Sequence, residues 1–196
     1  MGANSQGKKK KKPYQFAKVP CFLTGKLVLD TDRERIKQKL AKFLVDERGF
    51  SIDELIPDQE YFMEFKGKKI VSIIDLLIKI DDRILLLARC NPGSVVTRET
   101  CAISLARLFL PEHIIPYAIQ ANLDDVAILD VRNKKAIEYG WENIPLRSEL
   151  LEMTKNWPPP ALPENRIGIE QQLLFSYETH WRKDPPELRG DVLVYK

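Results

Sequence analysis

Asp75 is the residue whose type and surroundings most clearly suggest chemistry. It interrupts the apolar run Ser72-Ile73-Ile74-Asp75-Leu76-Leu77-Ile78. An ionised carboxylate in such a strand costs free energy unless it is paired, hydrogen-bonded or bound to a metal. The next apolar run ends in Ala88-Arg89-Cys90-Asn91. Side chains two apart on a strand share a face, so we expect Arg89 and Asn91 to face Asp75 from the neighbouring strand.

Two interpretations of Asp75 follow. A Mg²⁺ ion would need further oxygen ligands, and the cation at Arg89 would oppose it. Unit charges about 4 Å apart interact by roughly 4 kcal/mol at an effective dielectric of about 20, and a divalent ion doubles this. An ion pair between Asp75 and Arg89 across adjacent strands would instead satisfy both groups. We therefore predict this pair, with contact between Arg89 and a phosphate as the alternative.

The elements that must position these residues follow from apolar spacing. Asp30-Thr31-Asp32 supplies a helix start. Ile36, Leu40 and Leu44 then form one helical stripe, which Gly49 ends.

Alternating apolar runs and turns predict the rest of the core. We expect five strands, at 61–65, 70–80, 84–90, 114–121 and 126–131, and a second helix around 98–110. The order is helix, three strands, helix, two strands. This order predicts an α/β fold with a mixed sheet of about five strands flanked by helices.

The two ends of the chain differ from this core. The composition of residues 1–13 predicts a disordered basic tail, and residues 14–150 are expected to form a single domain. Residues 151–196 predict a Pro-rich linker and a C-terminal helical extension, with a helix over 171–181. The sequence leaves open whether the extension packs on the core or on a partner.

This order of features resembles the N-terminal domain of type I restriction enzyme R proteins, in the restriction-endonuclease-like, PD-(D/E)xK superfamily. Members carry a glutamate in the first helix, an Ala-Asp strand and a strand ending Val-Glu-Cys-Lys. Over residues 24–137, Glu34 falls on the helix glutamate and Asp75 on the aspartate. The resemblance implies catalytic positions at Asp75 and Glu34, with Mg²⁺ on Asp75. However, Arg89 and Asn91 occupy the acid and lysine positions.

The altered motif predicts a protein that keeps the fold without cleavage and binds double-stranded DNA or a partner protein. One alternative is an active Mg²⁺-dependent DNA endonuclease with migrated ligands, for which the candidates are Asp81, Asp82, Glu60 and Glu64. Another is a protein-interaction module without a nucleic-acid role. The chain has no Gly-x-x-x-x-Gly-Lys-Ser/Thr loop, which excludes ATP-driven DNA translocation by this chain alone.

Charge and composition limit these functions. The net charge is +3, of which Lys8–Lys12 supply +5, so the remainder carries −2. A dedicated DNA-wrapping body would carry a large positive excess. No run is apolar enough for a membrane span. Three cysteines without a CxxC pair favour free thiols in a reducing cytoplasm. We expect a cytoplasmic protein with no cofactor unless a Mg²⁺ site survives. Its oligomeric state is left open.

Overall fold

The computed structural model describes residues 17–180, 187–189 and 192–194. The predicted basic tail, including Lys8–Lys12, lies outside the described residues.

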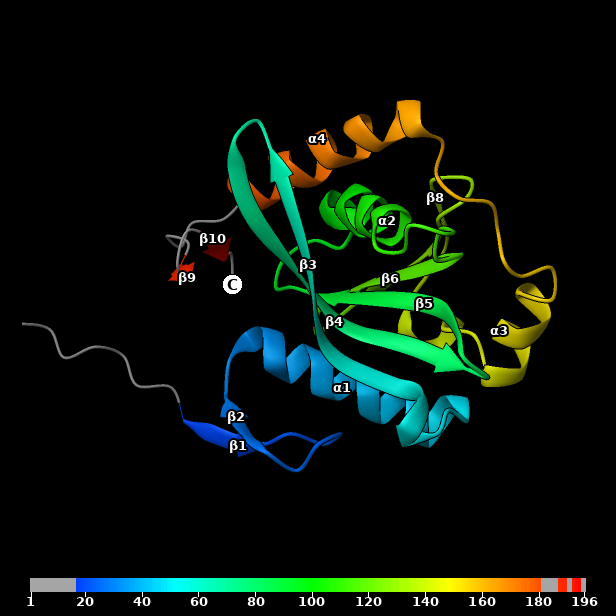
Figure 1. Ribbon diagram of the computed structural model, residues 1–196. Coiled ribbons are helices and arrows are strands. Elements are labelled where there is room, and N and C mark those ends of the chain that lie inside the picture. Colours follow the sequence, from blue (N-terminus) through cyan, green and yellow to red (C-terminus); the bar gives the residue numbers. More distant parts are fainter. Residues whose placement is uncertain (1–16, 181–186, 190–191, 195–196) are drawn as a thin grey trace, which may run out of the picture.

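A mixed β-sheet forms the centre of the molecule (Figure 1). Within the described ranges it has eight strands: β3 Leu55–Phe65, β4 Lys68–Ile80, β5 Arg83–Cys90, β6 Tyr117–Ala121, β7 Val126–Asp130, β8 Lys135–Tyr139, β9 Glu187–Arg189 and β10 Val192–Val194. The order is β8-β7-β6-β5-β4-β10-β9, and β3 pairs with the other edge of β4. The pairs β5–β6 and β4–β10 are parallel and the others antiparallel.

Helices cover both faces of this sheet. They are α1 Asp32–Arg48, α2 Glu99–Leu108, α3 Arg147–Met153 and α4 Glu164–His180. Figure 1 shows α1 on one face and α2 with α4 on the other. Short 3₁₀ turns occur at Ile52–Glu54, Val96–Arg98 and Trp141–Asn143. The α/β class and the mixed sheet flanked by helices are confirmed, although β8, β9 and β10 were not predicted.

The start and end of α1 match the sequence prediction. Thr31 is the N-cap, and its side chain accepts a hydrogen bond from the Glu34 amide. Gly49 takes a left-handed conformation with φ of 75°, where a glycine has no Cβ to clash. The stripe of Ile36, Leu40 and Leu44 is fully buried against the sheet. A small hairpin of β1 Lys18–Pro20 and β2 Leu27–Leu29 precedes the helix.

The two faces of the sheet carry separate apolar cores. Leu76, Ile78 and Ala88 belong to the core beneath α1. Leu77 and Leu87 belong to the core beneath α2 and α4. This alternation along β4 and β5 is the expected result of the pleat of a strand buried on both sides.

The strands β4 and β5 separate partway along β4. β4 pairs with β3 from Lys68 to Ile78, whereas its pairing with β5 ends at Leu76, opposite Ala88. Beyond that point the same strand pairs with β10, at Ile70 and Val71. Asp75 therefore lies at the fork between β4 and β5.

The C-terminal helix packs on the core. α4 lies against α2, and its Leu174 is completely buried in the core on that face. The predicted helix over 171–181 begins earlier, at Glu164. No helix in the described ranges is both long and apolar enough to cross a membrane.

Candidate functional site around Asp75

Three N–H groups bind the buried carboxylate of Asp75. The Arg33 guanidinium approaches it with both nitrogens of one edge, Nε at 2.5 Å from Oδ1 and Nη2 at 2.9 Å from Oδ2. The backbone amide of Cys90 donates to Oδ2 at 2.7 Å. Arg33 Nη2 also donates to the Ile73 carbonyl at 3.1 Å. Asp75 is 1% exposed, so these donors replace water as its partners.

The fork explains why the Cys90 amide is available. Directly after β5, the amide of Asn91 points toward β6 and donates to the Ala121 carbonyl. The preceding amide, that of Cys90, must point the opposite way, toward β4. Because the ladder with β4 has ended at Leu76, the Asp75 carboxylate takes the place of a strand carbonyl.

The predicted ion pair between Asp75 and Arg89 is wrong. Arg89 Nη1 lies 2.9 Å from Glu178 Oε1 on α4 and donates to Cys101 Sγ at 2.7 Å on α2. Asp75 pairs instead with Arg33 on α1. α1 thus brings Arg33, and α4 brings Glu178, to a charged residue of the sheet. Neither contact follows from the order of the elements along the chain.

Burial and charge oppose each other at both arginines. Burial alone would lower the pKa of Arg89, but Cys101, Glu178 and Asp75 together raise it. Burial would likewise lower the pKa of Arg33, and the charge and hydrogen bonds of Asp75 raise it. Both side chains therefore carry a fixed positive charge at any physiological pH.

Glu34 belongs to a neighbouring cluster on α1. Its carboxylate lies 2.8 Å from Lys37 Nζ and accepts a hydrogen bond from Gln38 at 3.1 Å. The same ammonium reaches Asp58 at 2.7 Å. Burial would lower the pKa of Lys37, but its hydrogen bonds to Asp58 and Glu34 raise it. Lys37 thus lies between two carboxylates, as a cation held by both.

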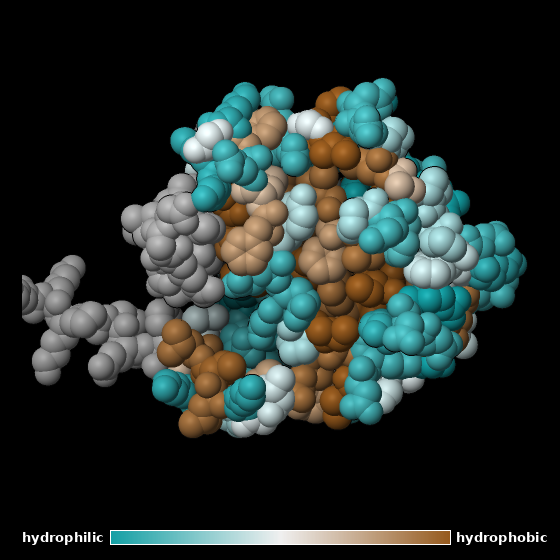
Figure 2. Space-filling view, viewed as in Figure 1, coloured by the Kyte–Doolittle hydropathy of each residue, from teal (hydrophilic) through white to brown (hydrophobic). Residues whose placement is uncertain are grey.

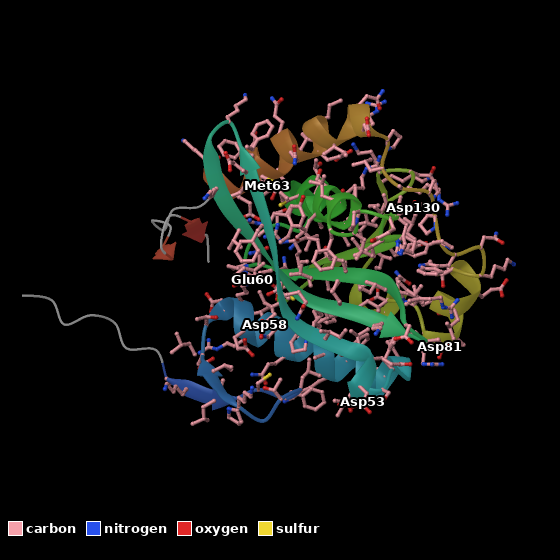
Figure 3. The ribbon with its side chains drawn as sticks, in the orientation of Figure 1. Asp53, Asp58, Glu60, Met63, Asp81 and Asp130 are labelled. Atoms are coloured by element: carbon pink, nitrogen blue, oxygen red, sulfur yellow. The ribbon has the colours of Figure 1, made fainter. Side chains whose placement is uncertain are left out.

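The candidates for migrated metal ligands do not converge on Asp75. Asp81 and Asp82 form the exposed turn between β4 and β5, paired with Arg83 at 3.6 Å and Lys79 at 2.7 Å. Figure 3 shows Asp81 at the β4–β5 turn, well away from Glu60, which lies midway along β3.

Glu64 is exposed near the tip of the β3–β4 hairpin. Across the described part of the chain, no group of three or more His, Cys, Asp or Glu side chains could hold a metal ion.

A second buried carboxylate, Glu170 on α4, ties that helix to the core. It accepts a hydrogen bond from Ser104 at 2.7 Å and from Lys134 at 2.7 Å, and Arg107 Nε lies 3.0 Å away. Burial would raise the pKa of Glu170, but the bonds from Lys134 and Ser104 and the charge of Arg107 lower it.

A groove of about 550 Å³ runs along the outer side of α1, where Glu34, Arg35 and Lys39 line it. Two of its cations, Arg35 and Lys39, have polar partners within the protein. Arg35 forms two hydrogen bonds with Asp30, and Lys39 binds the Leu123 carbonyl. Arg35 and Lys39 are therefore already engaged by groups of the protein itself.

No family model, curated protein or solved structure matches this chain. The function is therefore inferred from the charges and geometry of the site. Arg33, the residue that binds the Asp75 carboxylate, was not predicted from the sequence. It adjoins Glu34 in a charged first turn, and spacing alone does not distinguish it from Arg35. Which of the two reaches the sheet depends on how α1 is rotated against it.

Proposed function

We propose that this chain is a restriction-endonuclease-like domain that does not cleave DNA and binds it in double-stranded form. The observation that carries the loss of cleavage is the two-pronged contact of Arg33 with Asp75. A carboxylate offers about four lone-pair sites, and three of them accept hydrogen bonds here. A divalent ion would have to displace a guanidinium that is itself nearly buried.

The charges around Asp75 also argue against a metal-dependent site. Arg89 and Asn91 supply no anionic oxygen at the family's acid and lysine positions. Glu34, the other remnant position, is bound by Lys37. A metal at this fork would face fixed cations, and without several anionic ligands Mg²⁺ binding is weak. The geometry favours a structural ion-pair network over a hydrolytic centre.

DNA binding is supported by the resemblance and by the exposed lysines Lys66, Lys68 and Lys69 at the tip of the β3–β4 hairpin. The net charge of −2 outside Lys8–Lys12 requires such a contact to be local. A partner protein is the alternative ligand for the same fold.

Plasmid nicking tests the catalytic half of the proposal. We expect no nicking by the wild-type chain with Mg²⁺ or Mn²⁺, and the same result for Asp75→Asn. Nicking that depends on the metal and disappears in Asp75→Asn would establish an active nuclease.

Duplex binding across a salt series tests the other half. We expect an affinity that falls as salt rises, because lysine–phosphate contacts release counterions. Absence of binding at low ionic strength would instead indicate a protein partner.

A further inference from the structure

The β3–β4 hairpin ends in a two-residue turn, Lys66 and Gly67, with φ of 51° and 72°. Its closing pair is Phe65 opposite Lys68. Positive φ at both central residues is the type I′ pattern, which matches the twist of the two strands. Figure 1 shows this hairpin standing at one edge of the molecule, beside α4.

Lys66 is an unusual residue for its position in this turn. Asn, Asp and Gly dominate the first position of type I′ turns because they tolerate positive φ. A lysine there is strained by its Cβ. Such an outlier is a reason to look for a function of the side chain.

Three lysines gather within four residues at this tip: Lys66, Lys68 and Lys69, all exposed. Lys66 Nζ lies 5.3 Å from the centre of the Phe65 ring, and Lys68 Nζ lies 5.9 Å from that of Phe175 on α4. Between described residues, neither Lys66 nor Lys68 forms an ion pair with a carboxylate. Their charges are therefore held in place by aromatic rings without being neutralised.

The surroundings of the tip suit contact with a polyanion. In Figure 2 the surface over the hairpin tip is mainly hydrophilic. Phe62, on β3, is 61% exposed nearby. Outside Lys8–Lys12 the chain carries −2, so a lysine cluster here is a local positive site on a weakly acidic body. Lysine acts on phosphate as a point charge and carries no sequence information.

We propose that the hairpin tip, residues 65–69, contacts the phosphate backbone of double-stranded DNA. This inference rests on the proposed function and names the surface that performs it. Duplex DNA presents one negative charge per about 1.7 Å of its axis, so Lys66 and Lys68 would meet neighbouring phosphates at once. A two-stranded ribbon also matches the width that the major groove admits.

The test compares two triple variants of the full chain with equal loss of charge. The hairpin variant is Lys66→Gln, Lys68→Gln and Lys69→Gln. The control is Lys26→Gln, Lys135→Gln and Lys155→Gln, which are exposed lysines on other elements. The affinity for a labelled duplex is measured against salt. We expect the slope of log K against log salt to fall by about 2 in the hairpin variant and by less than about 1 in the control.

A single variant separates binding from folding. Lys66→Asn places a residue suited to positive φ in the turn while it removes one charge. We expect an unfolding midpoint equal to or above that of the wild type, together with a salt slope smaller by about 1. Weaker binding without weaker folding identifies a contact with DNA.

The outcomes distinguish the two proposals. Equal slopes in the two triple variants, with the wild type still binding DNA, would overturn the hairpin contact and leave the DNA-binding function standing. A wild type that binds no duplex at low salt would overturn both. Hairpin-dependent binding to phosphatidylserine vesicles, with no hairpin effect on DNA, would also overturn the inference.

Discussion

Arg33 neutralises the most deeply buried acid of the sheet from outside the sheet. Its side chain is 17% exposed and that of Asp75 is 2% exposed. Two hydrogen bonds in a planar fork make this pair stronger than a surface ion pair. The role of such a pair in stability is best tested by replacing one partner, because this leaves the other as a buried charge without compensation.

Arg33→Ala is therefore expected to lower the free energy of unfolding by about 3 kcal/mol or more. Arg35→Ala, two residues along the same helix, removes an exposed pair with Asp30 and should lower the free energy of unfolding far less. Urea unfolding measures both. Arg33→Ala combined with Asp75→Asn should recover part of the loss, since the amide oxygen still accepts from Cys90. Equal losses for Arg33 and Arg35 would contradict a structural role specific to this pair.

At the scale of elements, α4 is fixed by two carboxylates. Glu178 reaches Arg89 on β5, and Glu170 reaches Ser104 and Arg107 on α2 and Lys134 after β7. Apolar residues are not gathered on one face of α4, so these polar contacts contribute to its attachment to the core. α4 therefore belongs to the packed core, although a proline-rich segment separates it from the preceding helix.

The anchor at Glu170 gives α4 a pH dependence. Its pKa is lowered below the ordinary value of 4.5. The unfolded chain then binds this proton more tightly, so the stabilisation is complete above the unfolded-state pKa and is lost as pH falls through the folded-state value.

We expect Glu170→Gln to be less stable than the wild type at neutral pH, with a gap that narrows as the pH falls below about 4.5. Urea unfolding at a series of pH values measures this gap. The matched control is Glu164→Gln, an exposed acid at the start of the same helix, whose gap should stay near zero. A gap for Glu170→Gln that is constant with pH would mean that the charge of Glu170 contributes nothing.

At the scale of the whole molecule, the carboxylates of the site pair with cations of the same chain. α1 supplies Arg33 and Lys37 to Asp75, Glu34 and Asp58. These carboxylates are thus satisfied by cations of α1.

Mg²⁺ should therefore leave the thermal unfolding midpoint of the chain unchanged. A ligand that binds only the folded state stabilises it by about 2.7 kcal/mol at a concentration one hundred times its Kd. Thermal unfolding in millimolar Mg²⁺ and in EDTA provides the measurement. A midpoint that rises with Mg²⁺ and loses this rise in Asp75→Asn would indicate an intact metal site.

The sequence by itself determined the class of fold and most of its core elements. Alternating apolar runs predicted β3 to β7, and the stripe of Ile36, Leu40 and Leu44 between Thr31 and Gly49 predicted α1. These features are local, since they depend on the pleat of a strand and the period of a helix. Strand bounds were less well predicted, because β3 begins at Leu55, six residues before the strand expected at 61–65.

Only the tertiary structure decided which charges meet. The sequence predicted that Asp75 must be satisfied, and it is, but by Arg33 from α1 rather than by Arg89 from the adjacent strand. The rotation of α1 on the sheet and the docking of α4 set these partners, and both depend on packing between distant segments. A buried charge without a partner is strongly destabilising. Asp75 therefore pairs with the cation that helix packing places next to it, which is Arg33.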